Sequence, residues 1–200
     1  MEIKSTNKQE QRSAATRAKL VDAARALFAA RGYAAVGTEE IVRTAGVTRG
    51  ALYHQFRDKE QLFEAVFEQV EAETTQRIAE SALAGATDPL AALRAGARAF
   101  LAVCAEPEVE RIVLLDAPAV LGWARWREIG LRYGLGLVTG TLQAGMDAGA
   151  LAPQPVTPLA HVLLGALDEG ALYVARAQDR DTARAEVEAI VDRLIDGLAP

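Results

Sequence analysis

The chain has 200 residues, half of them hydrophobic, and a formal net charge of −5. A chain of this length can bury a sizeable core in one or two domains. It has no apolar run of about 18 residues, which excludes a transmembrane helix, and its polar first residues exclude a secretory signal. The single cysteine, Cys104, excludes an intramolecular disulfide and fits a reducing cytoplasm. Because no Cys/His cluster has metal-ligand spacing, we expect a cytoplasmic protein without a membrane segment, a metal or another cofactor.

Charge is distributed unevenly along the chain. Residues 1–60 hold 11 Lys and Arg against 7 Asp and Glu, whereas residues 61–200 hold 11 against 20. The overall negative charge argues weakly against nucleic-acid binding, but a basic end on an acidic body is typical of a DNA reader with a separate acidic domain. The alternative is a lysine-bearing tail on an ordinary acidic protein, and charge alone leaves that alternative open.

The first segments predict a tail and a bracing helix. Residues 1–12 are polar and are expected to be disordered. Residues 13–30 predict a helix that Gly32 ends. Its apolar stripe is formed by Leu20, Ala23, Ala24, Leu27 and Phe28.

Residues 38–59 predict two short helices joined by a tight turn. Thr38 is a candidate N-cap for the first helix, and Gly46 can adopt the left-handed conformation that ends it. Thr48 can cap a second helix over residues 49–55. Two helices joined by a short turn that contains Gly are typical of a helix-turn-helix unit, in which the second helix enters the DNA major groove.

The second helix of this unit has two different faces. Leu52 and Phe56 are expected to point inward, and the other face presents Thr48, Arg49, Gly50, Tyr53 and His54. Hydrogen-bond donors and a small Gly suit close approach to DNA. A plain helical hairpin with a solvated second helix is the alternative.

The next helix begins at Lys59, after Asp58 as N-cap, and extends to about residue 83. A cation in the first turn is disfavoured by the helix dipole, but a phosphate there would be favoured by the free amides and by the lysine. We therefore predict that Lys59 contacts a phosphate, the alternative being a solvated lysine.

Five further helices are predicted, over residues 88–105, 106–115, 121–149, 158–176 and 182–198, with Pro118 interrupting the second. The helix over 158–176 is apolar around much of its girth, as expected between subunits, and the last helix is amphipathic. Both patterns are typical of a homodimerisation surface, although ordinary intramolecular packing remains an alternative. No segment has strand periodicity, so the protein is expected to be all-α with about nine helices.

The head of the chain, over residues 17–67, resembles the TetR/AcrR family of bacterial transcriptional regulators. The resemblance is carried by the motif Ala-Ala-Arg-Gly-Tyr at 29–33, by Thr38 and Ile41, by the run Ala-Gly-Val-Thr-Arg-Gly-Ala-Leu-Tyr at 45–53, by Phe56, and by Lys-Glu-Gln-Leu at 59–62. Val42 and Gln55 depart from the commonest pattern, in which Ala and His are frequent.

The resemblance implies a homodimeric repressor that binds a palindromic operator in double-stranded DNA. A disordered tail (1–12) would precede a helix-turn-helix DNA-binding domain (13–58) and an effector-binding and dimerisation domain (59–200). Thr38 and Lys59 would contact phosphate, and Thr48, Arg49, Gly50, Tyr53 and His54 would lie in or beside the major groove. Arg49 is the candidate for bidentate readout of guanine, and Tyr53 for a backbone contact.

The body would bind a small hydrophobic or aromatic effector that changes the spacing of the two heads and lowers DNA affinity. Candidate pocket residues on the middle helices are Phe100, Cys104, Trp123, Trp126, Tyr133, Met146 and His161. An activator or an effector-independent DNA-binding protein is an alternative function. A remoter one is an all-α enzyme that uses Cys104, His161 and Asp116, although their spacing specifies no nucleophile and base.

Overall fold

The computed structural model describes residues 3–84 and 86–200, with side chains from residue 9 onward. Its helices, in chain order, are α1 (Ile3–Arg31), α2 (Thr38–Ala45), α3 (Arg49–Gln55), α4 (Lys59–Leu83), α5 (Pro89–Cys104), α6 (Pro107–Val109), the π-helix η1 (Glu110–Asp116), α7 (Ala117–Leu121), α8 (Trp123–Asp147), α9 (Val156–Arg176) and α10 (Arg180–Asp196). The described residues contain no strand. Because α6, η1 and α7 follow one another without a break, the all-α architecture with about nine helices is confirmed.

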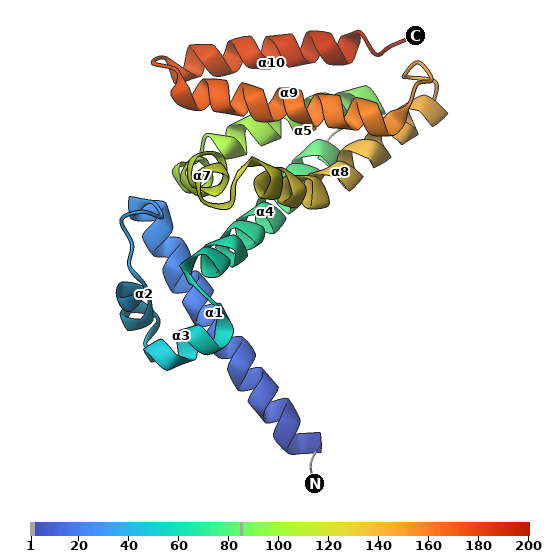
Figure 1. Ribbon diagram of the computed structural model, residues 1–200. Helices are drawn as coiled ribbons and strands as arrows, with labels where there is room; N and C mark the ends of the chain where they lie inside the picture. Colours follow the sequence, from blue (N-terminus) through green and yellow to red (C-terminus); the bar gives the residue numbers. More distant parts are fainter. Residues whose placement is uncertain (1–2, 85) are drawn as a thin grey trace.

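The helices form a small head and a larger body (Figure 1). Helices α1, α2 and α3 make the head, and α4 runs from the head into the body, where α5, α8, α9 and α10 pack in layers. Helix α1 begins well before the predicted start at residue 13, so residues 3–12 are helical rather than disordered, and residues 1–2 lie outside the described part. Residues 3–12 include no Pro or Gly, so no residue there breaks the helix.

Local side-chain caps form as the sequence predicts at α3 and α4. The Thr48 hydroxyl accepts a hydrogen bond from the Ala51 backbone N–H at 3.2 Å, and the Asp58 carboxylate accepts one from the Gln61 N–H at 2.8 Å. Each cap satisfies an amide that the first helical turn leaves free. The start of α3, the helix with the donor-bearing face, is therefore fixed by its own residues.

The sequence predicts the C-terminal end of α2 correctly, but not its N-terminal end. Gly46 ends the helix with a φ of 64°, the left-handed conformation expected of it. The predicted cap at the other end is wrong, because Gly37 is the N-cap residue and Thr38 is the first residue of the helix. The Ile41 N–H donates to the Gly37 carbonyl at 3.2 Å, which places the helix start one residue earlier than the threonine hydroxyl signal.

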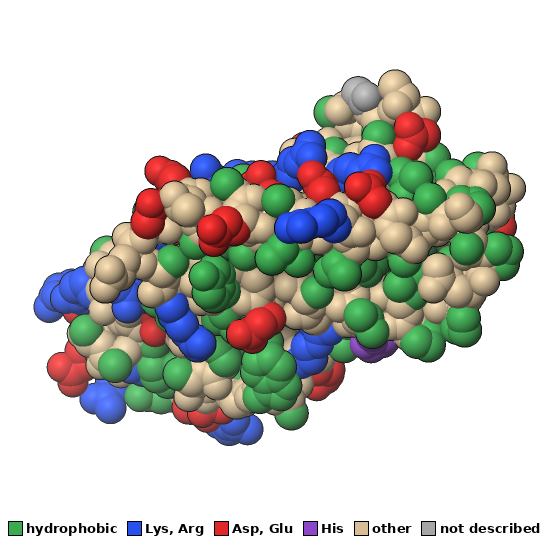
Figure 2. All heavy atoms as spheres, turned by 90° about the horizontal axis from the view of Figure 1, so that it is seen from above, with side chains coloured by type: hydrophobic (Ala, Val, Ile, Leu, Met, Phe, Trp, Pro, Cys, Tyr) green, Lys and Arg blue, Asp and Glu red, His purple; other side chains and the backbone are tan. Residues whose placement is uncertain are grey.

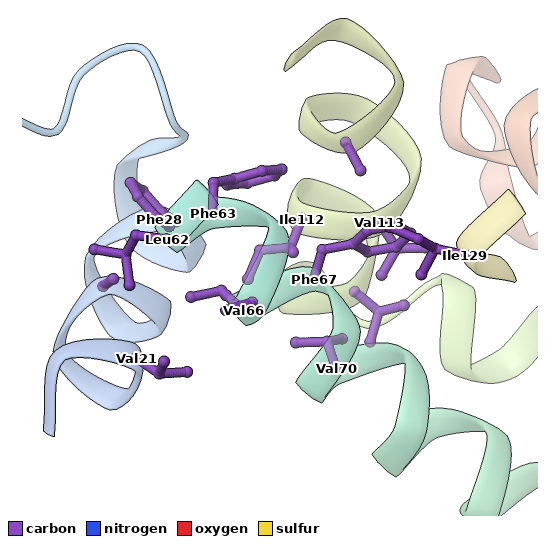
Figure 3. Close-up of a cluster of buried hydrophobic side chains, with 14 of the residues drawn as sticks. Val21, Phe28, Leu62, Phe63, Val66, Phe67, Val70, Ile112, Val113 and Ile129 are labelled. Atoms are coloured by element: carbon purple, nitrogen blue, oxygen red, sulfur yellow. The ribbon is translucent and has the colours of Figure 1, made fainter. Parts of the chain in front are cut away.

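One buried cluster joins the head to the body (Figure 3). Phe28 of α1 packs edge-on against Phe63 of α4, with ring centroids 5.4 Å apart. Further along α4, Phe67 lies in the same cluster as Ile112 of η1 and Ile129 of α8. The domain boundary predicted at residue 58 falls in the turn before α4, but the hydrophobic core continues across it, so the head and the body share one core.

Pro118 does not end the helical segment that begins at residue 107. The segment continues through η1 and α7 to Leu121. In η1 the ladder widens, and the Ala117 N–H donates to the carbonyl of Ile112, five residues earlier. The segment ends at Gly122, whose φ of 78° only glycine adopts without strain.

Candidate DNA-binding surface and ligand cavity

Helix α3 has the two faces that its sequence predicts. Leu52 and Phe56 are buried in the head, whereas Thr48, Arg49, Gly50, Tyr53 and His54 are all exposed. The first residues of α3 therefore stand at the surface with their hydrogen-bonding groups directed to solvent, as a groove-reading helix requires.

The guanidinium of Arg49 is held only loosely. Its side chain is 65% exposed, and its nearest charged partner is Glu39, with nitrogen and oxygen 3.6 Å apart. It also lies 5.6 Å from the centre of the Tyr53 ring. An exposed pair of this kind contributes at most about 1 kcal/mol, so Arg49 can leave Glu39 for a stronger acceptor.

Lys59 occupies a position that the sequence did not predict. Its ammonium donates to the backbone carbonyls of Tyr33 and Val36, each at 3.0 Å, and lies 3.8 Å from the centre of the Tyr33 ring. Burial lowers the pKa of Lys59. An ammonium has three N–H donors, so two hold the connector between α1 and α2, and the third is left for another acceptor. The solvated alternative is wrong, since the side chain is half-buried.

Gln55, the position where the sequence departs from the family pattern, braces α3 against α1. Its side-chain amide donates to the Ser13 hydroxyl at 2.8 Å. Thr38, at the start of α2, is half-buried.

A cavity of about 130 Å³ lies in the body, between α4, α5, η1, α8, α9 and α10. Three of the predicted pocket residues line it, namely Phe100, Cys104 and Trp126. The remaining four, Trp123, Tyr133, Met146 and His161, are not among its described lining residues. Phe100 and Cys104 reach it because the inner face of α5 is apolar, and Trp126 is fixed there by an indole N–H that donates to the Val113 carbonyl at 2.9 Å.

The four other residues pack or point elsewhere. Trp123 is 60% exposed and lies against Trp126, with ring centroids 4.7 Å apart. Tyr133 packs against the main cluster and Met146 against a smaller one around Leu142. His161 is exposed on α9. Aromatic or sulfur-containing character alone does not place a side chain in the cavity. The orientation of each helix about its own axis decides which of its side chains face that space.

The cavity also has polar groups that the sequence analysis missed. Glu71 of α4 and Asp168 of α9 line it, and Asp168 forms an ion pair with Arg127 of α8. Burial raises the pKa of Asp168 to about 6, and the neighbouring arginine opposes that rise. Burial, with the charge of Asp168, raises the pKa of Glu71 to about 7. The pKa of the Cys104 thiol is raised well above its usual range by burial.

One helical segment contacts both the cavity and the head. Val113 and Leu114 of η1 line the cavity. Asp116, at the end of η1, accepts a hydrogen bond from the Tyr33 backbone N–H at 2.7 Å. Tyr33 in turn offers its carbonyl to Lys59. The connector after α1 is thus bonded both to η1, which contributes to the cavity wall, and to the first turn of α4.

Two family descriptions match the chain. Residues 20–66 match "Bacterial regulatory proteins, tetR family", and residues 90–198 match "Tetracyclin repressor-like, C-terminal domain". The first spans most of the head with the first turns of α4, and the second extends from α5 to beyond α10.

Individual proteins show the same relationship. The chain is 35% identical to a TetR-family transcriptional regulator from Pectobacterium atrosepticum, whose crystal structure superposes with a TM-score of 0.85 over 94% of this chain and 96% of that one. It is 30% identical to the TetC protein of transposon Tn10 from Escherichia coli, over 71% of this chain and 69% of that protein. The regulator AcrR from Shigella flexneri is 37% identical over 44% of this chain and 40% of its own length.

A helix-turn-helix head on a larger all-helical body defines a class of DNA-binding regulators, and the exposed face of α3 fits that class. The matched regions cover both the head and the body, and the chain belongs to the TetR family of bacterial regulators. It is a DNA-binding transcriptional regulator and not an enzyme, so the enzyme alternative built on Cys104, His161 and Asp116 is wrong. Among the described residues, no helix is long and apolar enough to cross a membrane.

Proposed function

We propose that the protein is a homodimeric repressor that binds a palindromic operator and is released by a small, mainly apolar effector. The proposal is carried by two features that occur together. Helix α3 exposes its hydrogen-bond donors, and the body holds an apolar cavity that α4 links to the head. The relatives include two proteins named as transcriptional repressors, from Corynebacterium diphtheriae and Mycobacterium tuberculosis, which match over 34% and 35% of this chain.

The proposed DNA contacts follow from exposure and chemistry. Arg49 reads guanine through its two parallel N–H groups, and Thr48, Gly50, Tyr53 and His54 lie beside it in the groove. Thr38 and the third N–H of Lys59 face the phosphate backbone. Lys59 acts in addition through the connector, because its two carbonyl bonds set the angle between α1 and α2.

The proposed dimer surface is formed by α9 and α10. On the side of the molecule seen in Figure 2, hydrophobic side chains lie exposed among charged ones. Val162 and Tyr173 of α9 are 67% and 55% exposed, and Ile190 and Leu194 of α10 are 52% and 49% exposed. The first two are three helical turns apart and the last two one turn apart, so each pair shares a helix face. Exposed apolar faces on neighbouring helices favour a self-complementary helical interface.

Release follows from the packing between the cavity and the head. A ligand that displaces Val113 or Leu114 would also move Asp116, which is bonded to Tyr33 in the connector after α1. Movement of α4 reaches the head directly through the shared core. With this division of labour, residues 13–58 read DNA and residues 59–200 bind the effector and pair the subunits.

The proposal is tested by selecting genomic DNA fragments on the purified protein and then screening small molecules for release of the selected operator. A palindromic site bound by two copies and released by a small apolar compound is expected. A non-palindromic site bound by one copy would contradict the dimeric mode of reading. Release by no compound would favour an effector-independent DNA-binding protein, and increased transcription from the bound promoter would favour an activator.

The dimer surface is tested separately by light scattering. Val162→Glu and Ile190→Glu place a charge on the proposed interface and should produce monomers. Leu83→Glu is the matched control, because Leu83 is 72% exposed on α4 and lies outside α9 and α10. Dimers in the two interface variants, or dissociation in the control, would contradict the assignment.

A further inference from the structure

Glu71 is the one residue in the wall of the cavity whose charge has no counterpart within the described structure. It stands on the inner side of α4, between the buried residues Val70 and Thr74. The Thr74 hydroxyl donates to the carbonyl of Val70 at 2.8 Å, so its proton is already engaged. The backbone carbonyl of Glu71 accepts a second hydrogen bond from the same hydroxyl at 3.1 Å. The Glu71 carboxylate forms no hydrogen bond or ion pair with any described residue, whereas the second carboxylate of the cavity, Asp168, is paired with Arg127.

The Glu71 oxygens are nevertheless reachable. Among the described residues, no buried side-chain oxygen or nitrogen lacks a hydrogen-bond partner. Because Glu71 has no such partner, its carboxylate oxygens must retain accessible surface, and the residue borders the cavity. A carboxylate held among apolar walls without a partner costs several kcal/mol when it is ionised. The cavity therefore presents an acceptor that lacks a donor.

The charged and titratable groups that face Glu71 fix the sign of that donor. Asp168 comes from α9, Arg127 from α8 and the neutral thiol of Cys104 from α5. The phenol of Tyr133 on α8 lies outside the cavity wall and is neutral; burial raises its pKa, and the charge of Glu71 contributes to the rise. With both carboxylates ionised, two negative charges meet one positive charge, so the site has one negative charge in excess. A neutral donor would leave this excess buried, and an anion would add to it.

The rest of the wall limits the size and character of the ligand. Phe100, Trp126 and Leu167 are among the apolar side chains that surround the space. Its volume of about 130 Å³ is similar to that of an apolar cavity of roughly 150 Å³ that binds benzene. A single ring or a short branched chain fits a space of this size, and aromatic walls also attract a cation.

We propose that the cavity binds a small apolar amine in its protonated form, with the ammonium held by the carboxylate of Glu71 and the hydrocarbon part held by the apolar wall. The inference rests on the proposed function, because it names the chemical class of the effector. Glu71 acts as the specificity residue, and the Arg127–Asp168 pair supplies the neighbouring negative end.

The experiment measures binding to the full chain in the absence of DNA, by calorimetry and by the fluorescence of the tryptophans. The probes are benzylamine, benzyl alcohol and benzoate, with 2-phenylethylamine and cyclohexylmethylamine to vary the shape. Benzylamine or another amine should bind roughly 10- to 100-fold more tightly than benzyl alcohol, as expected of a charge-assisted hydrogen bond, and benzoate should bind most weakly.

The matched variants are Glu71→Gln and Glu80→Gln. Both change a glutamate of α4, but Glu80 is exposed and its carboxylate accepts only a side-chain bond from Gln76. Glu71→Gln should lose the preference for the amine and retain the affinity for the alcohol, while Glu80→Gln should behave as wild type. In the wild type, amine affinity should fall as pH decreases below about 7, because protonation of Glu71 removes the charge. This last readout needs no variant to fold.

Equal affinity for amine and alcohol, an amine preference that survives in Glu71→Gln, or no binding of any amine would overturn the inference. Failure of the proposed function has a different signature. If amines bind with the expected dependence on Glu71 but leave operator affinity unchanged, the assignment of ligand class stands and the release mechanism is wrong.

Discussion

Replacement of Lys59 by Met tests whether the ammonium holds the head together. The substitution keeps an unbranched apolar stem and removes the charged group. In the native structure that group donates two hydrogen bonds of 3.0 Å, to the carbonyls of Tyr33 and Val36, and lies 3.8 Å from the Tyr33 ring centre. All three contacts fix the connector between α1 and α2, which positions the helix-turn-helix unit.

The expected loss follows from these contacts. A hydrogen bond from a charged donor contributes about 1.5–3 kcal/mol, and an ammonium over an exposed ring about 0.5–1 kcal/mol. The side chain is half-buried, so water can replace part of what is lost. We therefore expect Lys59→Met to lower the free energy of unfolding by about 2–3 kcal/mol, and the melting temperature by about 4–12 °C for a chain of this size.

The assay is thermal and urea denaturation at one fixed protein concentration, since the stability of an oligomer depends on concentration. Lys19→Met is the control, because Lys19 is exposed on α1. A stability of Lys59→Met within about 0.5 kcal/mol of that control, the range of ordinary surface substitutions, would refute the structural role of the ammonium.

The phosphate contact of Lys59 is tested by DNA binding. If the third N–H contacts a phosphate, Lys59→Ala should weaken binding to all DNA sequences alike and reduce the salt slope by about one. A sequence-dependent loss would contradict that contact.

Four other substitutions give sharp outcomes. Arg49→Ala should abolish sequence preference and leave the dimer intact; gel-shift competition that still separates operator from random DNA would argue against guanine readout. Glu71→Gln should be more stable than wild type near pH 8 by on the order of 1–3 kcal/mol. In the wild type the unfolded state releases this proton near the ordinary pKa of 4.5 and the folded state only near 7, so stability falls as pH rises between these values. If the urea midpoints of wild type and Glu71→Gln differ by the same amount at low and at high pH, this linkage is contradicted. Gly136→Ala should stabilise α8 by about 0.5–1 kcal/mol, since no neighbouring element of the described structure comes within 4 Å of the added methyl group. Gly145→Ala should destabilise it, because its Cβ would lie 2.6 Å from the Leu151 side chain; the melting temperatures of the two variants, one above and one below wild type, check both.

The head could be predicted in detail because its signals are local. Thr48, Gly46 and Asp58 each act on amides or carbonyls within a few residues, so their effect depends little on the remainder of the fold. The alternation of buried Leu52 and exposed Tyr53 follows from helical periodicity once α3 has a side against α1. Even there, the N-cap of α2 is Gly37 rather than the predicted Thr38. Either of these adjacent residues could begin the helix, and the conformation of the connector selects Gly37.

The cavity could not be predicted in the same way. Periodicity shows that a helix face is apolar, but it does not say which neighbour covers that face or where space remains. Trp123 and Trp126 are three residues apart in one helix, and the packing of η1 buries the second and leaves the first in solvent. Glu71 was overlooked because a glutamate in a long amphipathic helix is usually a solvated charge.

The sequence by itself thus determined most of the helices, the two faces of α3 and the family, since these depend on residues close together in the chain. Tertiary structure alone decided the contacts between residues that are distant in sequence. Lys59 bonds to carbonyls 23 and 26 residues earlier, and Asp116 bonds to an amide 83 residues earlier. Glu71 shares a cavity with Arg127 and Asp168, which come from two other helices. Such meetings are set by how whole helices pack, and no local pattern encodes them.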